Sequence, residues 1–117
     1  MTTKQKLILF LISCEPGIKD TYTFVKLFDR VDFPAKIEEN LKLLLDDQLI
    51  VPAKWYDDNH TQPLVYSITP KGKIFIDRNF NDKEIIDYLN ELPLPNRLLE
   101  ITKIYIDKKS DLNTKHL

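Results

Sequence analysis

Hydrophobic residues spaced three and four positions apart predict three helices in the first half of the chain. The first helix covers residues 3–14 and ends at Glu15-Pro16-Gly17, because proline cannot continue a helix and glycine tolerates a left-handed turn. Asp20 or Thr21 caps the second helix, and Pro34 fits the first turn of the third. The third helix carries one stripe that we expect to face the core, formed by Ile37, Leu41, Leu44 and Leu45.

A β-hairpin is predicted next. Its strands cover residues 49–56 and 64–68, and the loop of residues 57–63 between them is longer than a tight turn. Thr69 caps a fourth helix and Pro70 opens it. We expect this helix to return three side chains to the core, namely Ile74, Phe75 and Phe80. The predicted class is mainly α, an α+β fold with one small hairpin.

The last third of the chain predicts a helical extension. A helix starts at Asp82, two prolines end it, and Asn96 caps a final helix that runs to about Lys109. That final helix is apolar over most of its circumference, so it needs cover on more than one side. A second subunit is the natural cover, which predicts a homodimer with candidate interface residues Leu98, Leu99, Ile101, Ile104 and Tyr105. The expected organisation is one domain over residues 1–80, an extension over 81–109 and a flexible tail over 110–117.

Composition limits the chemistry. The chain has 117 residues, enough for one core, and a net charge of −1, so any affinity for nucleic acid must come from local placement of charge. Two glycines are too few for a phosphate-binding loop, and one cysteine excludes an internal disulfide, which favours a reducing cytoplasm. Leu11-Ile12-Ser13-Cys14 matches a lipoprotein cleavage box, but its apolar run is short, and we favour a core helix. No run is long enough for a membrane span.

Two motifs carry a family resemblance. Residues 41–50 read Leu-Lys-Leu-Leu-Leu-Asp-Asp-Gln-Leu-Ile, and residues 66–72 read Tyr-Ser-Ile-Thr-Pro-Lys-Gly. Together they resemble the winged helix-turn-helix regulators of the MarR and PadR type over about residues 4–80. The resemblance implies a dimer whose third helix enters the major groove of duplex DNA, with the hairpin as a wing beside it. In that family a glycine stands where this chain has Gln48, which implies a strained or altered helix end.

The same resemblance assigns candidate DNA contacts to the second and third helices and the hairpin. Hydroxyl, amide and basic side chains donate to phosphates and base edges, and a glutamate can accept from cytosine. The candidates are Thr21, Tyr22, Thr23, Lys26, Lys36, Glu39, Asn40, Lys42 and Lys54. Acidic residues oppose this assignment, since Glu38 and Glu39 repel phosphate and the hairpin loop carries Asp57 and Asp58.

Catalysis and metal binding have weaker support. His60 with two neighbouring aspartates supplies fewer ligands than a structural zinc site uses, so we expect no metal or cofactor. Cys14 lies near an apolar face, and nothing pairs a nucleophile with a base, so we expect no enzyme activity.

Two functions therefore compete. The first is a cytoplasmic, dimeric, DNA-binding transcriptional regulator, which the motifs favour. The second is a winged-helix protein–protein interaction module without DNA binding, which the charges favour, together with Leu43 at an expected exposed position. A DNA-binding protein should present a contiguous positive patch, and an interaction module should present an apolar one.

Overall fold

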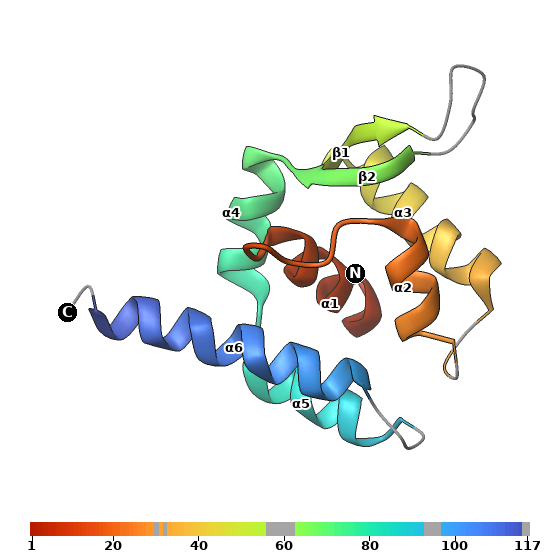
Figure 1. Cartoon of the computed structure of the whole chain (residues 1–117). Helices are drawn as coiled ribbons and strands as arrows, with labels where there is room; N and C mark the ends of the chain where they lie inside the picture. Colours follow the sequence, from red (N-terminus) through yellow and green to blue (C-terminus); the bar gives the residue numbers. More distant parts are fainter. Residues whose placement is uncertain (30, 32, 56–62, 93–96, 116–117) are drawn as a thin grey trace.

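The order of helices and strands follows the order that the sequence predicts. The computed structural model describes residues 1–29, 31, 33–55, 63–92 and 97–115. The elements are α1 (Thr3–Ser13), α2 (Thr21–Leu27), α3 (Pro34–Asp46), β1 (Ile50–Trp55), β2 (Pro63–Ile68), α4 (Pro70–Asn79), α5 (Asp82–Asn90) and α6 (Arg97–Lys115) (Figure 1). This arrangement confirms the mainly helical α+β class.

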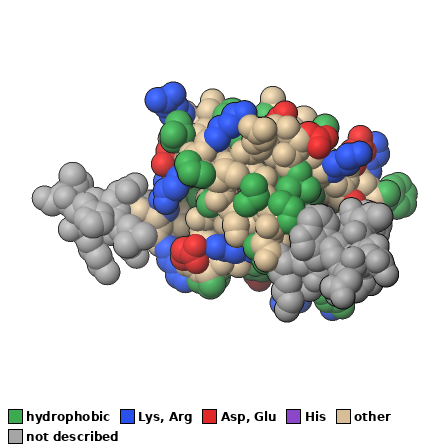
Figure 2. All heavy atoms as spheres, turned by 90° about the horizontal axis from the view of Figure 1, so that it is seen from above, with side chains coloured by type: hydrophobic (Ala, Val, Ile, Leu, Met, Phe, Trp, Pro, Cys, Tyr) green, Lys and Arg blue, Asp and Glu red, His purple; other side chains and the backbone are tan. Residues whose placement is uncertain are grey.

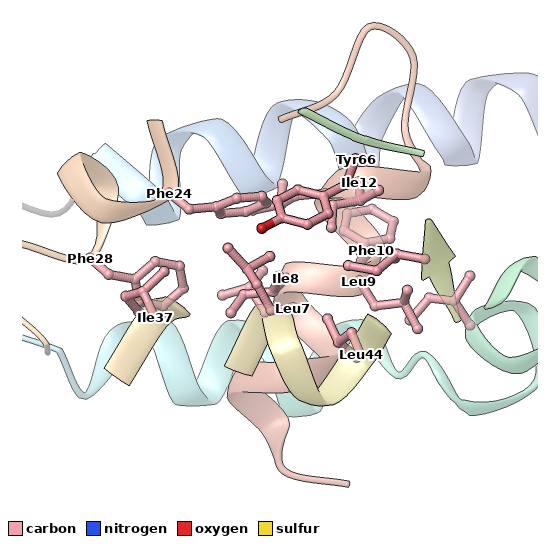
Figure 3. Packing of buried hydrophobic residues seen from close by; sticks show 14 of the residues in the cluster. Leu7, Ile8, Leu9, Phe10, Ile12, Phe24, Phe28, Ile37, Leu44 and Tyr66 are labelled. Carbon is pink, nitrogen blue, oxygen red and sulfur yellow. The ribbon is translucent and has the colours of Figure 1, made fainter. Parts of the chain in front are cut away.

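Helix α1 forms the centre of the molecule. It packs against α3, α4, α5 and β2, and it lies between them in Figure 1. The sequence predicts one buried side, yet Leu9 and Phe10 are buried as well, so the helix is covered all round. Figure 3 shows side chains of α1 packed against Phe24, Phe28 and Ile37 from the two following helices. Each large side chain buried in this way contributes about 1.5–3 kcal/mol to folding.

The hairpin has one paired side and one edge. β1 and β2 run antiparallel with Ile50 opposite Ile68, and the register becomes irregular between Pro52 and Trp55. On its other side β2 pairs with a short extended segment that follows α1. Asp20 and Val65 form an antiparallel β-bridge, and the Tyr66 N–H donates to the Lys19 carbonyl at 2.7 Å. Hydrophobic periodicity does not predict this segment. β2 is therefore the middle of a small three-segment layer, and β1 is its edge.

Helix α4 corrects one predicted core position. Ile74 is 53% exposed, whereas Gly72 and Ile76 are the buried residues of this helix. Residues four positions apart share one side of a helix, and Ile74 lies two positions from each, on the opposite side. Phe75 and Phe80 do pack against the core, and the Phe80 ring stacks on Phe10 with centroids 4.1 Å apart.

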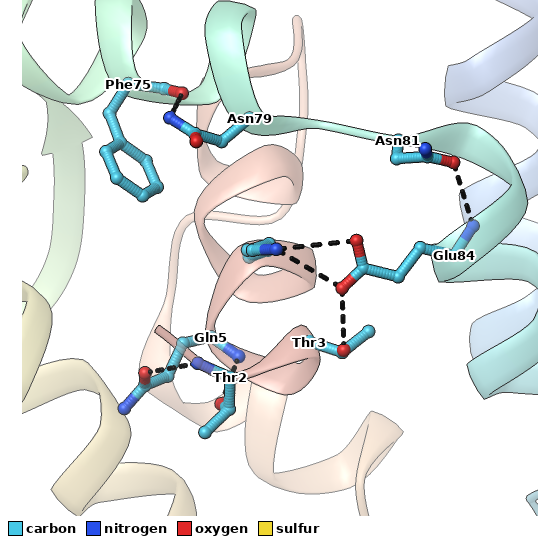
Figure 4. Close-up of polar contacts among 8 residues, drawn as sticks. Thr2, Thr3, Gln5, Phe75, Asn79, Asn81 and Glu84 are labelled. Atoms are coloured by element: carbon cyan, nitrogen blue, oxygen red, sulfur yellow. Dashed lines mark hydrogen bonds and ion pairs between the residues drawn. The ribbon is translucent and has the colours of Figure 1, made fainter.

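Helix α5 is tied to the start of α1 through Glu84. Its carboxylate accepts a hydrogen bond from the Thr3 hydroxyl at 2.8 Å and one from the Lys6 ammonium at 3.2 Å (Figure 4). These donors lower the pKa of Glu84, the Thr3 hydroxyl first and Lys6 next. Asn81 caps α5 by accepting from the Glu84 N–H. The contacts fix the first C-terminal helix to the centre of the fold.

Helix α6 is longer and better covered than expected. It runs to Lys115 rather than about Lys109. Leu98, Thr102 and Ile106 are buried at i, i+4 and i+8 within a single chain. This corrects the expectation that a second subunit must cover Leu98. Among the other proposed interface residues, Leu99, Ile101 and Tyr105 are half-buried against the core, while Ile104 is 54% exposed. Asn96 lies outside the described residues.

Candidate nucleic-acid interface

The two sequence motifs meet in space at the α3–β1 corner (residues 47–49). The C-terminus of α3 forms a Schellman motif, in which the Gln48 N–H donates to Leu45 and the Leu49 N–H donates to Leu44, both at 3.0 Å. Gln48 has a φ of 61°, the left-handed conformation that glycine usually supplies. Of the two expected alternatives, a strained or an altered helix end, the structure shows the strained one, because the usual geometry is kept with Gln48 in the place of glycine.

The start of α4 clamps this corner. The Thr69 hydroxyl donates to the Gln48 carbonyl at 2.7 Å and accepts from the Gly72 N–H at 2.9 Å. The Thr69 N–H donates to the Leu49 carbonyl at 3.1 Å. A Cβ on Gly72 would lie 2.1 Å from that carbonyl oxygen, so only glycine fits at this approach. The corner sets the direction in which the chain leaves α3 for the hairpin.

The core side of α3 determines which residues remain outside. Ile37, Leu41 and Leu44 are buried, so the opposite side of the helix faces solvent. We name this the outward face of α3; its exposed residues are Ala35, Lys36, Glu39, Lys42, Leu43 and Asp46. Leu43 is 44% exposed, as expected from its position. Asn40 is half-buried, and its side-chain amide donates to the Lys36 carbonyl at 2.8 Å.

Charges on this face nearly cancel. Lys36 and Lys42 are accompanied by the exposed acids Glu39 and Asp46, and the Lys36 ammonium lies 3.5 Å from the Glu39 carboxylate. Both members of that pair are well exposed, so the pair is weak and a phosphate can compete for the lysine. The view from the hairpin side likewise shows basic and acidic side chains interspersed (Figure 2). The described part of α3 therefore presents no continuous positive patch.

The start of α2 offers fewer contacts than the sequence predicts. Thr21 is buried, and its hydroxyl donates to the Tyr66 hydroxyl at 3.2 Å, which removes it from the candidate DNA contacts. The Thr23 hydroxyl donates to the Asp20 carboxylate at 2.8 Å. That carboxylate also accepts from the Thr23 N–H, so an acid already occupies the helix N-terminus where a phosphate would bind. Sequence alone could not show that the chain bends Thr21 inward.

Two further candidates on α2 remain accessible. Tyr22 is 58% exposed, and the Lys26 ammonium lies 4.9 Å from the centroid of its ring. This cation–π contact keeps the lysine charge at the surface. Lys54 lies in β1, but its side chain is outside the described residues. The same holds for Asp57, Asp58 and His60 of the hairpin loop.

Phe33 is an exposed aromatic residue that the sequence analysis did not select. It is the N-cap of α3 and is 77% exposed, the highest value among the large hydrophobic side chains described. The signal was available, because a residue that precedes Pro34 and lies outside the helix contributes no side chain to the buried stripe. Phe33 and Leu43 place apolar surface at opposite ends of α3.

Chemistry beyond binding finds little support in the described residues. Burial raises the pKa of the Cys14 thiol to about 11, so the thiol is protonated and weakly nucleophilic at neutral pH. Within residues 1–29, 31, 33–55, 63–92 and 97–115, no cluster of three His, Cys, Asp or Glu residues is placed to hold a metal ion. In the same ranges, no helix combines the length and the apolar character that crossing a membrane requires.

Comparison with known proteins adds no relative to this description. No protein-family model, curated protein or solved structure matches the chain.

Proposed function

We propose that this chain is a winged-helix protein that binds duplex DNA through the outward face of α3 and acts as a transcriptional regulator. The observation that carries the proposal is the α3–β1 corner. Residues of the two motifs fix the C-terminal end of α3 there, while the side of α3 that faces away from the core stays exposed beside the hairpin. A rigidly held helix with one free side is suited to enter a major groove.

The accessible basic residues predict a weak electrostatic contribution. Lys26, Lys36 and Lys42 are the candidate phosphate contacts whose side chains are described and exposed. Three such contacts correspond to a slope of about −3 in log K against log salt, far shallower than in strongly basic proteins. Glu39 and Asn40 are the proposed contacts to base edges; Glu39 can accept from cytosine at a specific site, but on random duplex its charge mainly repels phosphate.

A fluorescence anisotropy titration with labelled random duplex at about 50 mM salt tests the proposal directly. Lys42→Gln should weaken binding and reduce the salt slope by about 0.9, because one phosphate contact is lost. Glu39→Gln should strengthen binding, because it removes a repelling charge. Lys83→Gln is the matched control, since Lys83 is exposed on α5. Absence of binding at micromolar protein would refute the proposal.

The dimer is part of the same proposal and rests on Ile104. Among the side chains of α6 that the structure describes, Ile104 is the exposed large apolar one, and it shares a polar side of the helix with Glu100, Lys103 and Asp107. Ile104→Asp should reduce the mass measured by light scattering from twice 13.8 kDa to 13.8 kDa, because it places a charge in an apolar contact. Lys103→Asp is the control for charge. A monomeric unmodified protein would refute the dimer.

A second candidate function is protein binding without DNA, and the exposure of Phe33 and Leu43 favours it. Phenylalanine is enriched at protein interfaces, and exposed apolar surface at both ends of α3 is surface that a partner can cover. The two functions separate on one measurement. A protein interaction module gives no salt-dependent anisotropy change with duplex DNA, whereas the regulator does.

A further inference from the structure

A cleft of about 490 Å³ lies between the end of α1, α4 and the C-terminal half of α6. Its volume falls within the range of about 300–1,000 Å³ that is common for small-ligand sites. Phe10, Ile76 and Tyr105 supply an apolar wall, and the Phe10 ring is stiffened by its stacking on Phe80. The residues that line the cleft are not part of the outward face of α3. They belong to the end of α1 and the turn after it, to α4 and to α6.

Basic residues surround the apolar wall. Lys73, Lys108 and Lys109 line the cleft together with two acids, Glu15 and Asp77. The Glu15 carboxylate is largely exposed and accepts a hydrogen bond from Lys19 at 2.9 Å, which places a fourth ammonium group beside the cleft. Three lining ammonium groups against two carboxylates give the cleft a local positive balance, although the whole chain is slightly acidic.

Two of these lysines are held over aromatic rings. The Lys109 ammonium lies 4.7 Å from the Phe80 centroid and 5.9 Å from that of Phe10. The Lys108 ammonium lies 5.4 Å from the Tyr105 centroid. A cation over a ring face retains most of its capacity to bind an anion, because the ring carries no formal charge. The cations therefore lie beside the surface on which an apolar ligand would rest.

Tyr105 adds a directional donor. Its hydroxyl oxygen accepts a hydrogen bond from the Gly17 N–H at 3.1 Å, which leaves the hydroxyl hydrogen to donate to a ligand. The same bond joins α6 to the turn after α1, so a ligand in the cleft would contact both walls. Figure 1 shows the C-terminal half of α6 extending past α4.

We propose that this cleft binds a small amphipathic organic anion, with its aromatic or branched apolar body against Phe10, Ile76 and Tyr105 and its carboxylate or sulfonate between Lys73 and Lys109. The apolar wall selects against inorganic phosphate and sulfate, which offer no surface for it to cover. The lysines select against neutral hydrophobic molecules of the same size. The Cys14 thiol, protonated at neutral pH, adds no competing negative charge.

The probe for this site is 8-anilinonaphthalene-1-sulfonate, an aromatic anion whose fluorescence rises in apolar surroundings. N-phenyl-1-naphthylamine, which has a similar body without the sulfonate, is the neutral comparison. The Lys73→Gln/Lys109→Gln variant should raise the Kd of the anionic probe about fivefold or more, because it removes two charge-assisted contacts. The Lys83→Gln/Lys103→Gln variant, which carries the same charge change at exposed positions of α5 and α6, should leave that Kd within about twofold.

The neutral probe keeps the test decisive. If the lysine variant keeps its affinity for the neutral probe and loses affinity for the anion, the cleft is intact and its charge selects anions. An equal loss for both probes, an equal effect of both double variants, or no saturable binding of the anion would overturn the proposal. None of these results depends on DNA binding, so this site and the proposed function fail or succeed separately.

Discussion

The α3–β1 corner follows α3 directly, and the outward face lies on that same helix. The two regions differ in how many of their polar groups are bonded within the chain. At the corner, the Gln48 carbonyl, the Leu49 carbonyl and the Gly72 N–H are all bonded within the chain. On the outward face, Lys36, Lys42 and Leu43 project into solvent, and the Lys36–Glu39 pair is a weak surface contact.

This difference separates the residues that define the fold from those that define a partner. The motif residues at the corner, Gln48, Leu49, Thr69 and Gly72, are bonded or packed within the chain. Core packing does not constrain the residues of the outward face. We therefore expect their types to reflect what the protein binds. A change at the corner should therefore alter stability, and a change on the outward face should alter binding.

Gly72→Ala should give the largest effect and break the corner. Its Cβ would lie 2.1 Å from the Leu49 carbonyl oxygen, and this backbone contact can relax only if α4 or β1 shifts. We expect the free energy of unfolding to fall by about 2–3 kcal/mol, measured by chemical denaturation. Lys73→Ala, at the next and exposed position, is the control. An unchanged midpoint for Gly72→Ala would mean that α4 does not approach the corner this closely.

Thr69→Val should weaken the same corner without a steric clash. Valine has nearly the same shape but loses both the cap on α4 and the bond to Gln48. The expected loss is about 1–2 kcal/mol in the free energy of unfolding. Thr69→Ser retains the hydroxyl and should stay closer to the unmodified protein. Equal losses for both variants would assign the effect to packing of the methyl group instead.

Gln48→Gly should sharpen the comparison by stabilising the corner. A residue with a φ of 61° is strained unless it is glycine. We expect a gain of about 0.5–1 kcal/mol after the larger entropy of glycine in the unfolded chain is subtracted. Asp47→Gly is the matched control, because Asp47 has a φ of −81° and gains nothing from glycine. Its melting temperature should fall while that of Gln48→Gly rises.

Leu43→Gln should have the smallest effect on stability. The side chain is on the outward face, and glutamine has nearly the same helix propensity as leucine, so the change should stay within about 0.5 kcal/mol. A thermal melt measures it, with Lys42→Gln for comparison. A loss of several kcal/mol would show that Leu43 contributes to the core and does not belong to the outward face.

Local signals predicted the fold well where caps and periodicity agree. Asp20, Pro34 and Thr69 mark helix starts that the structure contains. The Tyr66-to-Gly72 motif predicted where α4 begins, and the absent glycine predicted the strained Gln48. These signals act within a few residues of the chain, so the sequence alone is sufficient to read them.

The candidate site was less predictable because it depends on contacts between distant segments. Thr21 was expected to reach DNA, but Tyr66, 45 positions later, draws its hydroxyl inward. Leu98 was expected to need a partner, but the chain's own core buries it. Such positions are set by tertiary packing, which periodicity does not encode.

Pro52 has a consequence for how copies of this protein can associate. It lies in β1, the edge of the layer, where it cannot donate a backbone hydrogen bond, and the register beside it is irregular. An edge strand interrupted in this way pairs poorly with a strand of another molecule. The hairpin is therefore protected against joining a continuous intermolecular sheet. Backbone pairing between the hairpins of two copies is therefore disfavoured, which limits one route to fibre growth.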